Sequence, residues 1–218
     1  MRAVFFSVIL LFSFQLSCQD MGKDMIILPK PSLNSNVSIE QALYNRRSIR
    51  SYKKEPLTLQ EVSQLLWSAY GTTKSGKKTC PSAGATYPLE IYLVCGEVEG
   101  LKTGLYHYNS LEHSLRKIND ADLRKQLTIA SLHQEYIEES PASIIIAADF
   151  SKTTKVYGSR GERYVYMEVG HCGQNIHLQC ESLNLGTVVI GAFEDDKVKK
   201  ILQIKEEPLY IMPIGRKP

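Results

Sequence analysis

The longest amphipathic pattern in the chain runs from about residue 161 to residue 183. Apolar side chains recur at helical spacing and form one stripe, made of Val165, Val169, Cys172, Ile176, Cys180 and Leu183. A second side of the same segment carries Tyr164, Met167, His171 and Leu178. Because a helix that is apolar around most of its circumference must be covered on most sides, the pattern predicts a helix at the centre of the molecule or of a dimer.

Shorter helical patterns carry recognisable start and stop signals. Ser38 with Gln41 three residues later predicts a capping box before a helix that runs to about Arg46. Thr58 with Glu61 repeats this signal before an apolar face of the next helix, which we expect to end at Gly71. Two further helices are predicted over residues 120–130 and 195–202.

Runs of β-branched and aromatic residues predict the strands. Residues 143–148 form a continuous apolar run, which is typical of a strand buried on both faces. The other expected strands cover residues 89–95, 187–193 and 209–214, and a hairpin joins 104–108 to 114–118. Strands and helices in this order predict one α+β domain with helices packed on a sheet.

The N-terminus has the pattern of an export signal. Residues 1–17 contain Arg2 followed by an apolar run over 3–14, which is too short to span a bilayer comfortably. Cys18 could carry a lipid, although Gln15 stands where such sites have an aliphatic residue, and an uncleaved anchor is the alternative. Residues 18–37 are polar and rich in proline, so we expect a tether between this segment and a domain over 38–218. The chain is then exported or membrane-associated, in the periplasm or cell envelope, and cytoplasmic if residues 1–17 are not a signal.

Composition excludes several classes of protein. The 218 residues are 43% hydrophobic and 22% charged, as in a soluble globular domain. A net charge of +3 without a basic stripe does not indicate nucleic-acid binding. Cys172 and Cys180 are expected on the same helix, where eight residues rise about 12 Å. This separation exceeds the roughly 7 Å that a disulfide allows, so no disulfide scaffold is expected. The cluster of Lys74, Lys77 and Lys78 is either a solvated loop or a means of attracting an anionic cofactor.

Three distant segments are suited to holding a phosphorylated planar cofactor. Residues 46–50 combine three arginines with Ser48, a set that can grip a phosphate. Residues 81–88 begin with small side chains, so that backbone N–H groups can approach a ligand closely. Residues 215–217 add two cations at the end of the last expected strand. Since the glycine-rich nucleotide fingerprints are missing, arginines and backbone amides would have to bind any phosphate; for residues 46–50, the alternative is a solvated helix end.

In order and spacing, these segments resemble the signature of the nitroreductase superfamily over residues 39–217. The fuller patterns at residues 81–90, 104–108 and 157–160 are similar to the SagB-type, azoline dehydrogenase-like subgroup. The resemblance implies a central, mostly antiparallel sheet wrapped by helices, with the long central helix at the interface of a homodimer. It also implies an FMN cofactor.

The residues that the resemblance assigns to FMN are Arg46, Arg47, Ser48, Arg50, Pro81, Ser82, Ala83, Gly84, Ile190, Gly191 and Arg216. Residues 46–50 would contact the phosphate and ribityl chain, and Arg216 would close on the phosphate. Residues 81–84 would pass the isoalloxazine ring, usually from the partner subunit. A backbone N–H of Ile190 or Gly191 would face flavin N5.

The implied reaction is hydride transfer from NADH or NADPH to a small organic acceptor, such as a nitro compound, quinone or enone, by a ping-pong mechanism. Tyr157 or Lys155 could donate a proton, or could belong to a surface loop. Peptide dehydrogenases of this type carry adjacent Lys and Tyr, whereas Val156 separates them here, so a modified peptide ring is a second choice of substrate. A further alternative is an exported flavin- or ligand-binding module without turnover. Nicotinamide donors are scarce outside the cytoplasm, so an exported enzyme would need another donor.

A metal site is not expected. His171, Cys172, His177 and Cys180 invite a zinc interpretation, but helical spacing scatters them around the axis, so one helix cannot form a tetrahedral cage. Packing in the core explains these residues more simply.

Overall fold

A seven-stranded antiparallel sheet forms the centre of the computed structural model, which describes residues 25–218. Its strands are β1 (Met25–Ile27), β3 (Leu89–Cys95), β5 (Gly104–Asn109), β6 (Ser114–Asn119), β7 (Ala142–Ala148), β8 (Leu185–Thr187) and β9 (Glu207–Arg216). They lie in the order β1-β6-β5-β3-β7-β9-β8, and every neighbouring pair is antiparallel. A separate parallel pair joins β2 (Leu57–Thr58) to β4 (Val98–Glu99). The predicted α+β fold class is therefore confirmed.

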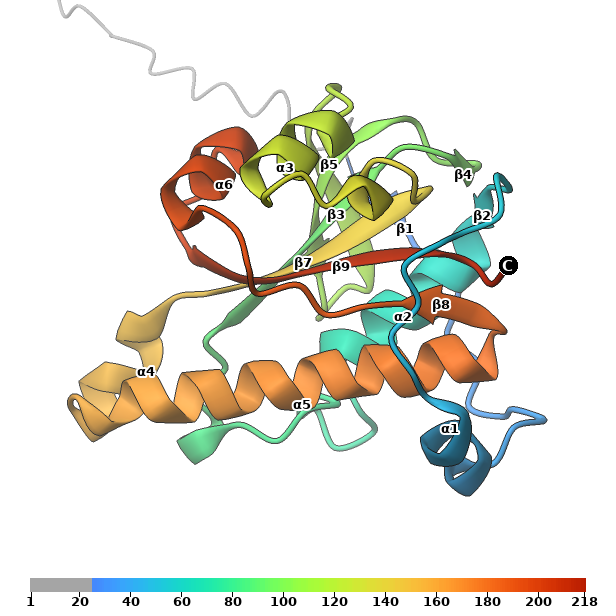
Figure 1. The fold of residues 1–218 in the computed structure, drawn as a ribbon. Coiled ribbons are helices and arrows are strands. Elements are labelled where there is room, and N and C mark those ends of the chain that lie inside the picture. The colour runs from blue at the N-terminus through green and yellow to red at the C-terminus, as the bar shows by residue number, and fades with distance from the viewer. Residues whose placement is uncertain (1–24) are drawn as a thin grey trace, which may run out of the picture.

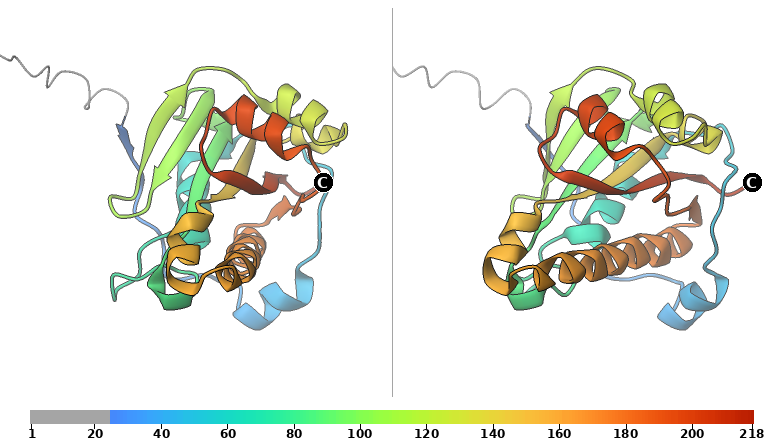
Figure 2. Two further views of the ribbon diagram at one scale, coloured as in Figure 1. Left: turned by 90° about the vertical axis from the view of Figure 1, so that its left-hand side faces the viewer. Right: turned by 60° about the vertical axis from the view of Figure 1, so that its left-hand side comes forward.

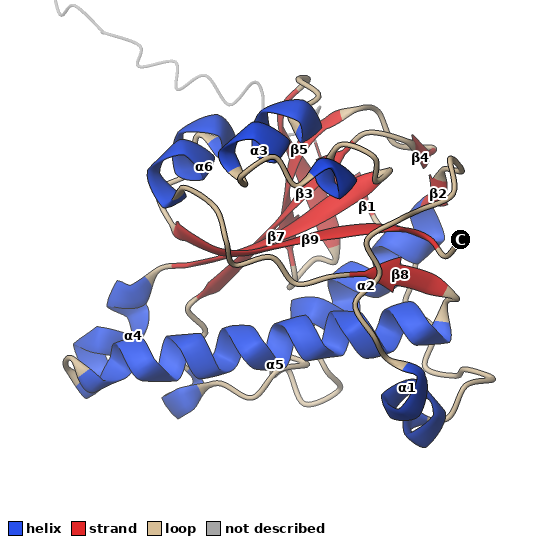
Figure 3. Cartoon of the chain, in the orientation of Figure 1, coloured by secondary structure: helices blue, strands red, loops and turns tan. Residues whose placement is uncertain are grey.

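Helices cover both faces of this sheet (Figures 1 and 3). They are α1 (Ile39–Asn45), α2 (Leu59–Tyr70), α3 (Arg124–Ala130), α4 (Phe150–Tyr157), α5 (Arg160–Ser182) and α6 (Asp195–Leu202), with short 3₁₀ turns η1 (Ala83–Ala85) and η2 (Glu135–Ile137). Helix α5 runs along one face beside α2, with α4 at one of its ends and α1 at the other, whereas α3 and α6 lie on the opposite face (Figures 1 and 2). The long central helix therefore spans the whole of its layer.

Strand β7 divides two hydrophobic cores. Its residues are all buried, as the apolar run predicts. Ile144 and Ile146 face the core formed with α2 and α5, whereas Ile145 and Ala147 face the core formed with α3 and α6. Because successive side chains of a strand point to opposite faces, one uninterrupted apolar run serves both cores.

Both predicted capping boxes are present. The Ser38 hydroxyl accepts from the Gln41 amide at 3.2 Å while the Gln41 side chain accepts from the Ser38 amide, also at 3.2 Å. Thr58 and Glu61 make the equivalent pair of bonds at the start of α2, and Gly71 ends that helix. These local signals are reliable because they satisfy backbone donors that the helix itself leaves unpaired.

The expected tether is partly wrong. Residues 1–24, with the export segment and Cys18, lie outside the described residues. Residues 25–37, however, pack on the domain: β1 pairs with β6, and the Ser32 backbone N–H and C=O both bond the Gln64 side chain, at 2.7 and 3.1 Å. Residues 25–37 therefore belong to the domain rather than to a tether, because their backbone groups hydrogen-bond to a neighbouring strand and side chain.

Three other boundaries differ from the sequence expectation. Helix α4 occupies residues expected to be a loop, because Asp149 caps it by accepting from the Ser151 amide. Helix α3 begins at Arg124 rather than near 120, since the Arg124 amide donates a hydrogen bond to the Asp122 carboxylate, which precedes the helix. The strand expected over 187–193 ends at Thr187 and continues only as an isolated bridge between Ile190 and Ile211.

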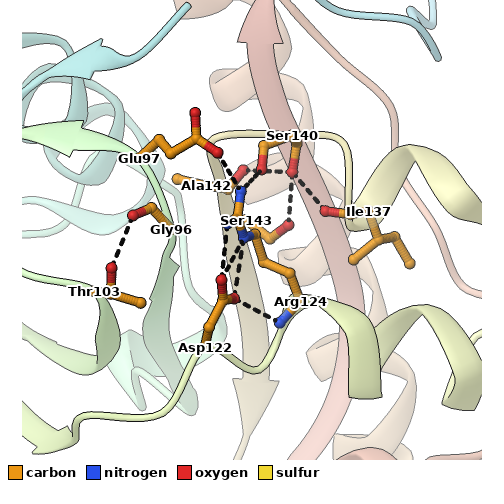
Figure 4. A network of polar contacts seen from close by, with 9 residues as sticks. All are labelled: Gly96, Glu97, Thr103, Asp122, Arg124, Ile137, Ser140, Ala142 and Ser143. Atoms are coloured by element: carbon orange, nitrogen blue, oxygen red, sulfur yellow. Dashed lines mark hydrogen bonds and ion pairs between the residues drawn. The ribbon is translucent and has the colours of Figure 1, made fainter. Parts of the chain in front are cut away.

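A polar network attaches the start of α3 to the sheet (Figure 4). The Arg124 guanidinium bonds both oxygens of Asp122, the Glu97 carboxylate at 3.2 Å and the Ser140 carbonyl at 3.0 Å. It lies directly over Gly96, where a Cβ would come within 2.1 Å of the guanidinium carbon. This arginine is fully neutralised by the chain itself, which contrasts with the arginines described next.

Candidate functional site

The first group of candidate residues follows α1, where the chain leaves the helix in an extended conformation at Arg46. Ile49 then fixes residues 46–50 against β8, because its amide donates to the Thr187 carbonyl at 2.9 Å and its side chain is buried. Gly186 makes room for this contact, since a Cβ there would lie 2.7 Å from Ile49. The sheet edge thereby holds the arginine segment in place.

The arginines of this segment are not neutralised by the chain. Among residues 25–218, Arg46, Arg47 and Arg50 form no ion pair within 4 Å and no side-chain hydrogen bond. Arg46 nevertheless acts on His177 of α5, which is 6% exposed: burial, and then the Arg46 charge, lowers the pKa of His177 to about 4. Free guanidinium groups beside α5 are suited to an incoming phosphate, with which they make charge-assisted bonds.

Arg216 behaves differently. Its guanidinium lies 2.7 Å from one Glu61 oxygen and 3.5 Å from Glu55, and it also donates to the Pro56 carbonyl. The charge of Arg216 is therefore neutralised at the start of α2, and the structure does not bring it to Arg46 or Arg50 through any contact.

The neighbouring Lys217 lies on the side of the candidate site. Its ammonium is 2.7 Å from a Glu181 oxygen, one helical turn beyond His177 on α5. Both terminal cations are thus ion-paired within the chain, Arg216 with Glu61 and Lys217 with Glu181. They reach different helices because consecutive residues of an extended segment point to opposite faces.

The second group of candidate residues lies around η1. Gly84 has a φ of +57°, and a Cβ there would lie 2.6 Å from the Tyr157 hydroxyl. Tyr157 ends α4, is 37% exposed and packs edge-on against Tyr164 of α5, with ring centres 5.1 Å apart. The structure thus brings Tyr157 next to the loop of Pro81, Ser82, Ala83 and Gly84, and the Ser82 hydroxyl accepts from the Tyr87 amide at 3.0 Å. Lys155 lies on α4, exposed and without a partner among the described residues.

Glu168 is a polar residue of this region that sequence reasoning did not select. It is 2% exposed on α5 and accepts a hydrogen bond of 2.6 Å from the Tyr70 hydroxyl. Burial raises the pKa of Glu168, and hydrogen bonds from Tyr70 and Ser82 partly offset that effect. Its position three residues after Val165, at the edge of the apolar stripe, was the signal that a carboxyl group lies inside the protein.

Ile190 and Gly191 lie over the middle of α5. The Ile190 amide donates a hydrogen bond to the Ile211 carbonyl at 2.9 Å, whereas the Gly191 amide donates to no described residue. Gly191 is exposed, and the Tyr210 ring lies between it and Gly173 of α5, 3.8 and 3.3 Å from the Cβ positions of these two glycines. Of the two residues, only Gly191 therefore offers a free N–H.

Within one chain the two groups lie far apart. Tyr157 and Tyr164 mark the N-terminal end of α5, and Glu181 with Lys217 marks its C-terminal end. Seventeen residues separate Tyr164 from Glu181, which corresponds to about 25 Å along the helix axis. A single copy of the chain therefore does not gather the predicted cofactor residues into one site.

Other candidate features do not change this assignment. A cavity of about 810 Å³ lies between residues 32–42, α2 and α5, and none of the predicted cofactor residues lines it. Within residues 25–218, no cluster of His, Cys, Asp or Glu is arranged to hold a metal. No helix in the described part combines the length and apolar character needed to cross a bilayer.

The antiparallel sheet with a long helix along one face defines an α+β domain, and comparison with known proteins identifies its family. The model of the Nitroreductase family matches residues 43–216, so the chain belongs to the nitroreductase family. At the level of its family it is an oxidoreductase of the flavin-dependent type.

Three similar proteins illustrate the relationship. The chain is 50% identical over 182 residues to the nitroreductase-named protein MJ1384 of Methanocaldococcus jannaschii, covering 83% of this chain and 92% of that protein. It is 25% identical over 210 residues to the microcin B17-processing protein McbC of Escherichia coli, covering 89% and 76%. A nitroreductase-type crystal structure from Ralstonia eutropha superposes with a TM-score of 0.79 at 26% identity, covering 91% and 92% of the two chains. The kinship with McbC agrees with the azoline dehydrogenase-like subgroup that the motifs indicate.

Proposed function

We propose that this protein is an FMN-dependent oxidoreductase that works as a homodimer and passes a hydride from NADH or NADPH to a small organic acceptor. The observation that carries the proposal is the set of arginines at residues 46–50, which β8 holds in place and no described residue neutralises. Cations left unpaired on a segment whose backbone is fixed by β8 fit a phosphorylated cofactor better than they fit a solvated helix end.

The donor set fits the phosphate of FMN. Arg46 and Arg50 would bind it with charge-assisted hydrogen bonds, and the Ser48 hydroxyl would add a neutral one. Lys217 would complete the set by turning from Glu181, and Arg216, the ligand that the resemblance implies, would have to leave Glu61 to take part.

A second copy would complete the site. The loop of residues 81–84 belongs to the opposite end of α5, so a two-fold arrangement with α5 against α5 would bring the loop of one copy to the arginines of the other. Tyr166 and Met167 of α5 are 58% and 51% exposed, and such an interface would cover these large apolar side chains.

The chemistry then divides between the cofactor and the chain. FMN, when bound, supplies the group that accepts and returns the hydride. The free Gly191 N–H would hydrogen-bond the ring, and the 81–84 backbone would orient it and exclude water. Tyr157, held over Gly84, would move a proton at its hydroxyl, with Lys155 as the alternative donor. The nicotinamide and the acceptor would use the same face in turn, as a ping-pong scheme requires.

The test uses the full chain. Purified protein is mixed with FMN, dialysed, and examined for a retained flavin absorbance. Anaerobic mixing with NADH or NADPH should then bleach that absorbance. A flavin that binds and never bleaches with either donor would favour the binding module without turnover, and protein that retains no flavin would contradict the cofactor assignment.

A dehydrogenase acting on modified peptide rings is the second candidate function. Its support is the similarity to McbC, whose name describes microcin processing, and the contact of Tyr157 with the Gly84 loop. Val156 between Lys155 and Tyr157 argues for small acceptors instead. Turnover of an azoline-containing peptide in preference to a quinone or nitro compound would reverse this order.

We also propose attachment of the domain to a membrane through its N-terminal residues. Fractionation of cells that express the chain with a C-terminal tag tests this, because truncation before residue 25 should move the protein to the soluble fraction. An unchanged distribution would remove the proposal.

A further inference from the structure

A separate hollow of about 360 Å³ lies beside the 81–88 loop and away from the arginine segment. Strands β3 and β5 form its floor, and the loop after α2 and helix α4 form its sides. Four of its lining residues carry titratable side chains, namely Lys78, Glu90, His107 and Lys152. Its volume is at the lower end of the range that holds small ligands, about 300–1,000 Å³.

The charges in this hollow do not balance. Glu90 is shared by two partners, the Lys152 ammonium at 2.6 Å and His107 Nε2 at 2.9 Å. Lys78 has no carboxylate within 4 Å among residues 25–218, and its ammonium bonds only the Ser110 hydroxyl. Two ammonium groups against one carboxylate leave at least one positive charge without a partner.

The position of Lys78 makes this charge costly. Its side chain is half-buried, and burial lowers the pKa of Lys78. The ammonium lies 5.6 Å from the ring centre of Tyr70 and 6.0 Å from that of Tyr87, and the Glu90 charge and the Ser110 hydroxyl also stabilise it. A partly desolvated cation of this kind gains much from an anion that replaces its lost water.

Aromatic walls define the rest of the ligand. Tyr70, Tyr87 and Tyr108 all line the hollow, together with Leu89. Aromatic side chains prefer offset or edge-on contact with another ring. A ligand with one flat ring and one negative charge would satisfy both the walls and Lys78.

We propose that this hollow is a binding site for a small aromatic monoanion, whose carboxylate pairs with Lys78 while its ring packs against Tyr87. The site is separate from the residues assigned to FMN, although Tyr87 connects it to the loop that carries Ser82 and Gly84. The inference does not depend on the proposed oxidoreductase activity, because it rests on Lys78 and the tyrosine walls alone.

Isothermal titration of the full chain with benzoate tests the proposal, and benzamide is the uncharged probe of the same shape. Benzoate should bind at least ten times more tightly than benzamide. Lys78→Met, which keeps the alkyl stem, should weaken benzoate binding at least tenfold, whereas Lys78→Arg should keep it within about threefold. Lys77→Met is the matched control in the same loop, where Lys77 is exposed, and should bind as the unchanged protein does.

Amine labelling gives a second measurement that needs no variant. Saturating benzoate should slow reductive methylation of Lys78 at least fivefold and leave Lys77 unaffected. Equal benzoate affinity with and without the Lys78 charge, labelling of Lys78 that benzoate does not slow, or no binding at all would overturn the proposal. Because FMN retention is measured separately and needs none of these residues, a failure here leaves the cofactor assignment standing.

Discussion

The Glu61 carboxylate lies 2.7 Å from the guanidinium of Arg216, which comes 155 residues later in the chain. The same carboxylate closes the capping box of α2 by accepting from the Thr58 amide at 2.8 Å. One acidic side chain therefore satisfies a helix N-terminus and ties the last strand of the sheet to that helix. Burial raises the pKa of Glu61, but bonds from Arg216 and Thr58 outweigh it, so the pKa lies below its ordinary value.

Arg216→Met should lower the free energy of unfolding by about 1–3 kcal/mol, because it leaves Glu61 partly buried without its charged partner. A group with a lowered pKa contributes stability above its unfolded pKa and loses it as the pH falls through the folded value. The difference between the two proteins should therefore shrink below pH 4.5, the ordinary value of Glu61. Urea denaturation at several pH values measures this, with Lys205→Met as an exposed control. FMN affinity that falls as sharply as stability would return Arg216 to the phosphate site.

Arg46→Ala should weaken FMN binding about 10- to 100-fold, the effect of losing one hydrogen bond from a charged group, about 1.5–3 kcal/mol. Arg160→Ala removes the same charge at the other end of α5 and should change the affinity less than threefold. Fluorescence titration of FMN measures both. Equal affinities in the two variants would show that residues 46–50 do not bind the phosphate.

Gly84→Ala should destabilise the protein by about 1–2 kcal/mol, because a φ of +57° strains any residue with a Cβ. The new methyl group would also lie 2.6 Å from the Tyr157 hydroxyl. Tyr157→Phe in the same chain removes that oxygen and should restore part of the loss, which a double-mutant cycle by urea denaturation detects. Strictly additive effects would mean that the two residues do not touch.

His177 should make stability depend on pH in the mildly acidic range. Its folded pKa of about 4 lies below the ordinary 6.5, so between these pH values His177 is protonated in the unfolded chain and neutral in the folded chain. Stability contributed by the neutral ring is complete above pH 6.5 and is lost as the pH falls towards 4, by at most about 3 kcal/mol. His177→Gln should flatten this part of the stability curve, measured by denaturation at each pH. An identical slope in both proteins would place the titrating group elsewhere.

Local order was predictable from the sequence wherever the signal was short in range. The capping boxes at Ser38 and Thr58, the stop at Gly71 and the continuous apolar strand β7 depend on neighbouring residues or on burial of a whole segment, and all of them are present. Helix α4 escaped prediction because a single cap, Asp149, and packing against α5 support it rather than any clear apolar period. The β1 segment escaped for a similar reason, since its partner β6 lies about ninety residues further on.

For the site, the sequence by itself determined which chemical groups are present: arginines around Ser48, a small-residue loop at 81–84 and cations at the C-terminus. Only the tertiary structure decided which of them act together. Arg216 forms an ion pair with Glu61 and Lys217 with Glu181, and Tyr157 lies over Gly84. Residues 46–50 and the loop of residues 81–84 lie at opposite ends of α5. The physical reason is that ion pairs and hydrogen bonds form between groups that are close in the folded chain. Pairs such as Glu61 with Arg216 join residues that no local sequence pattern connects.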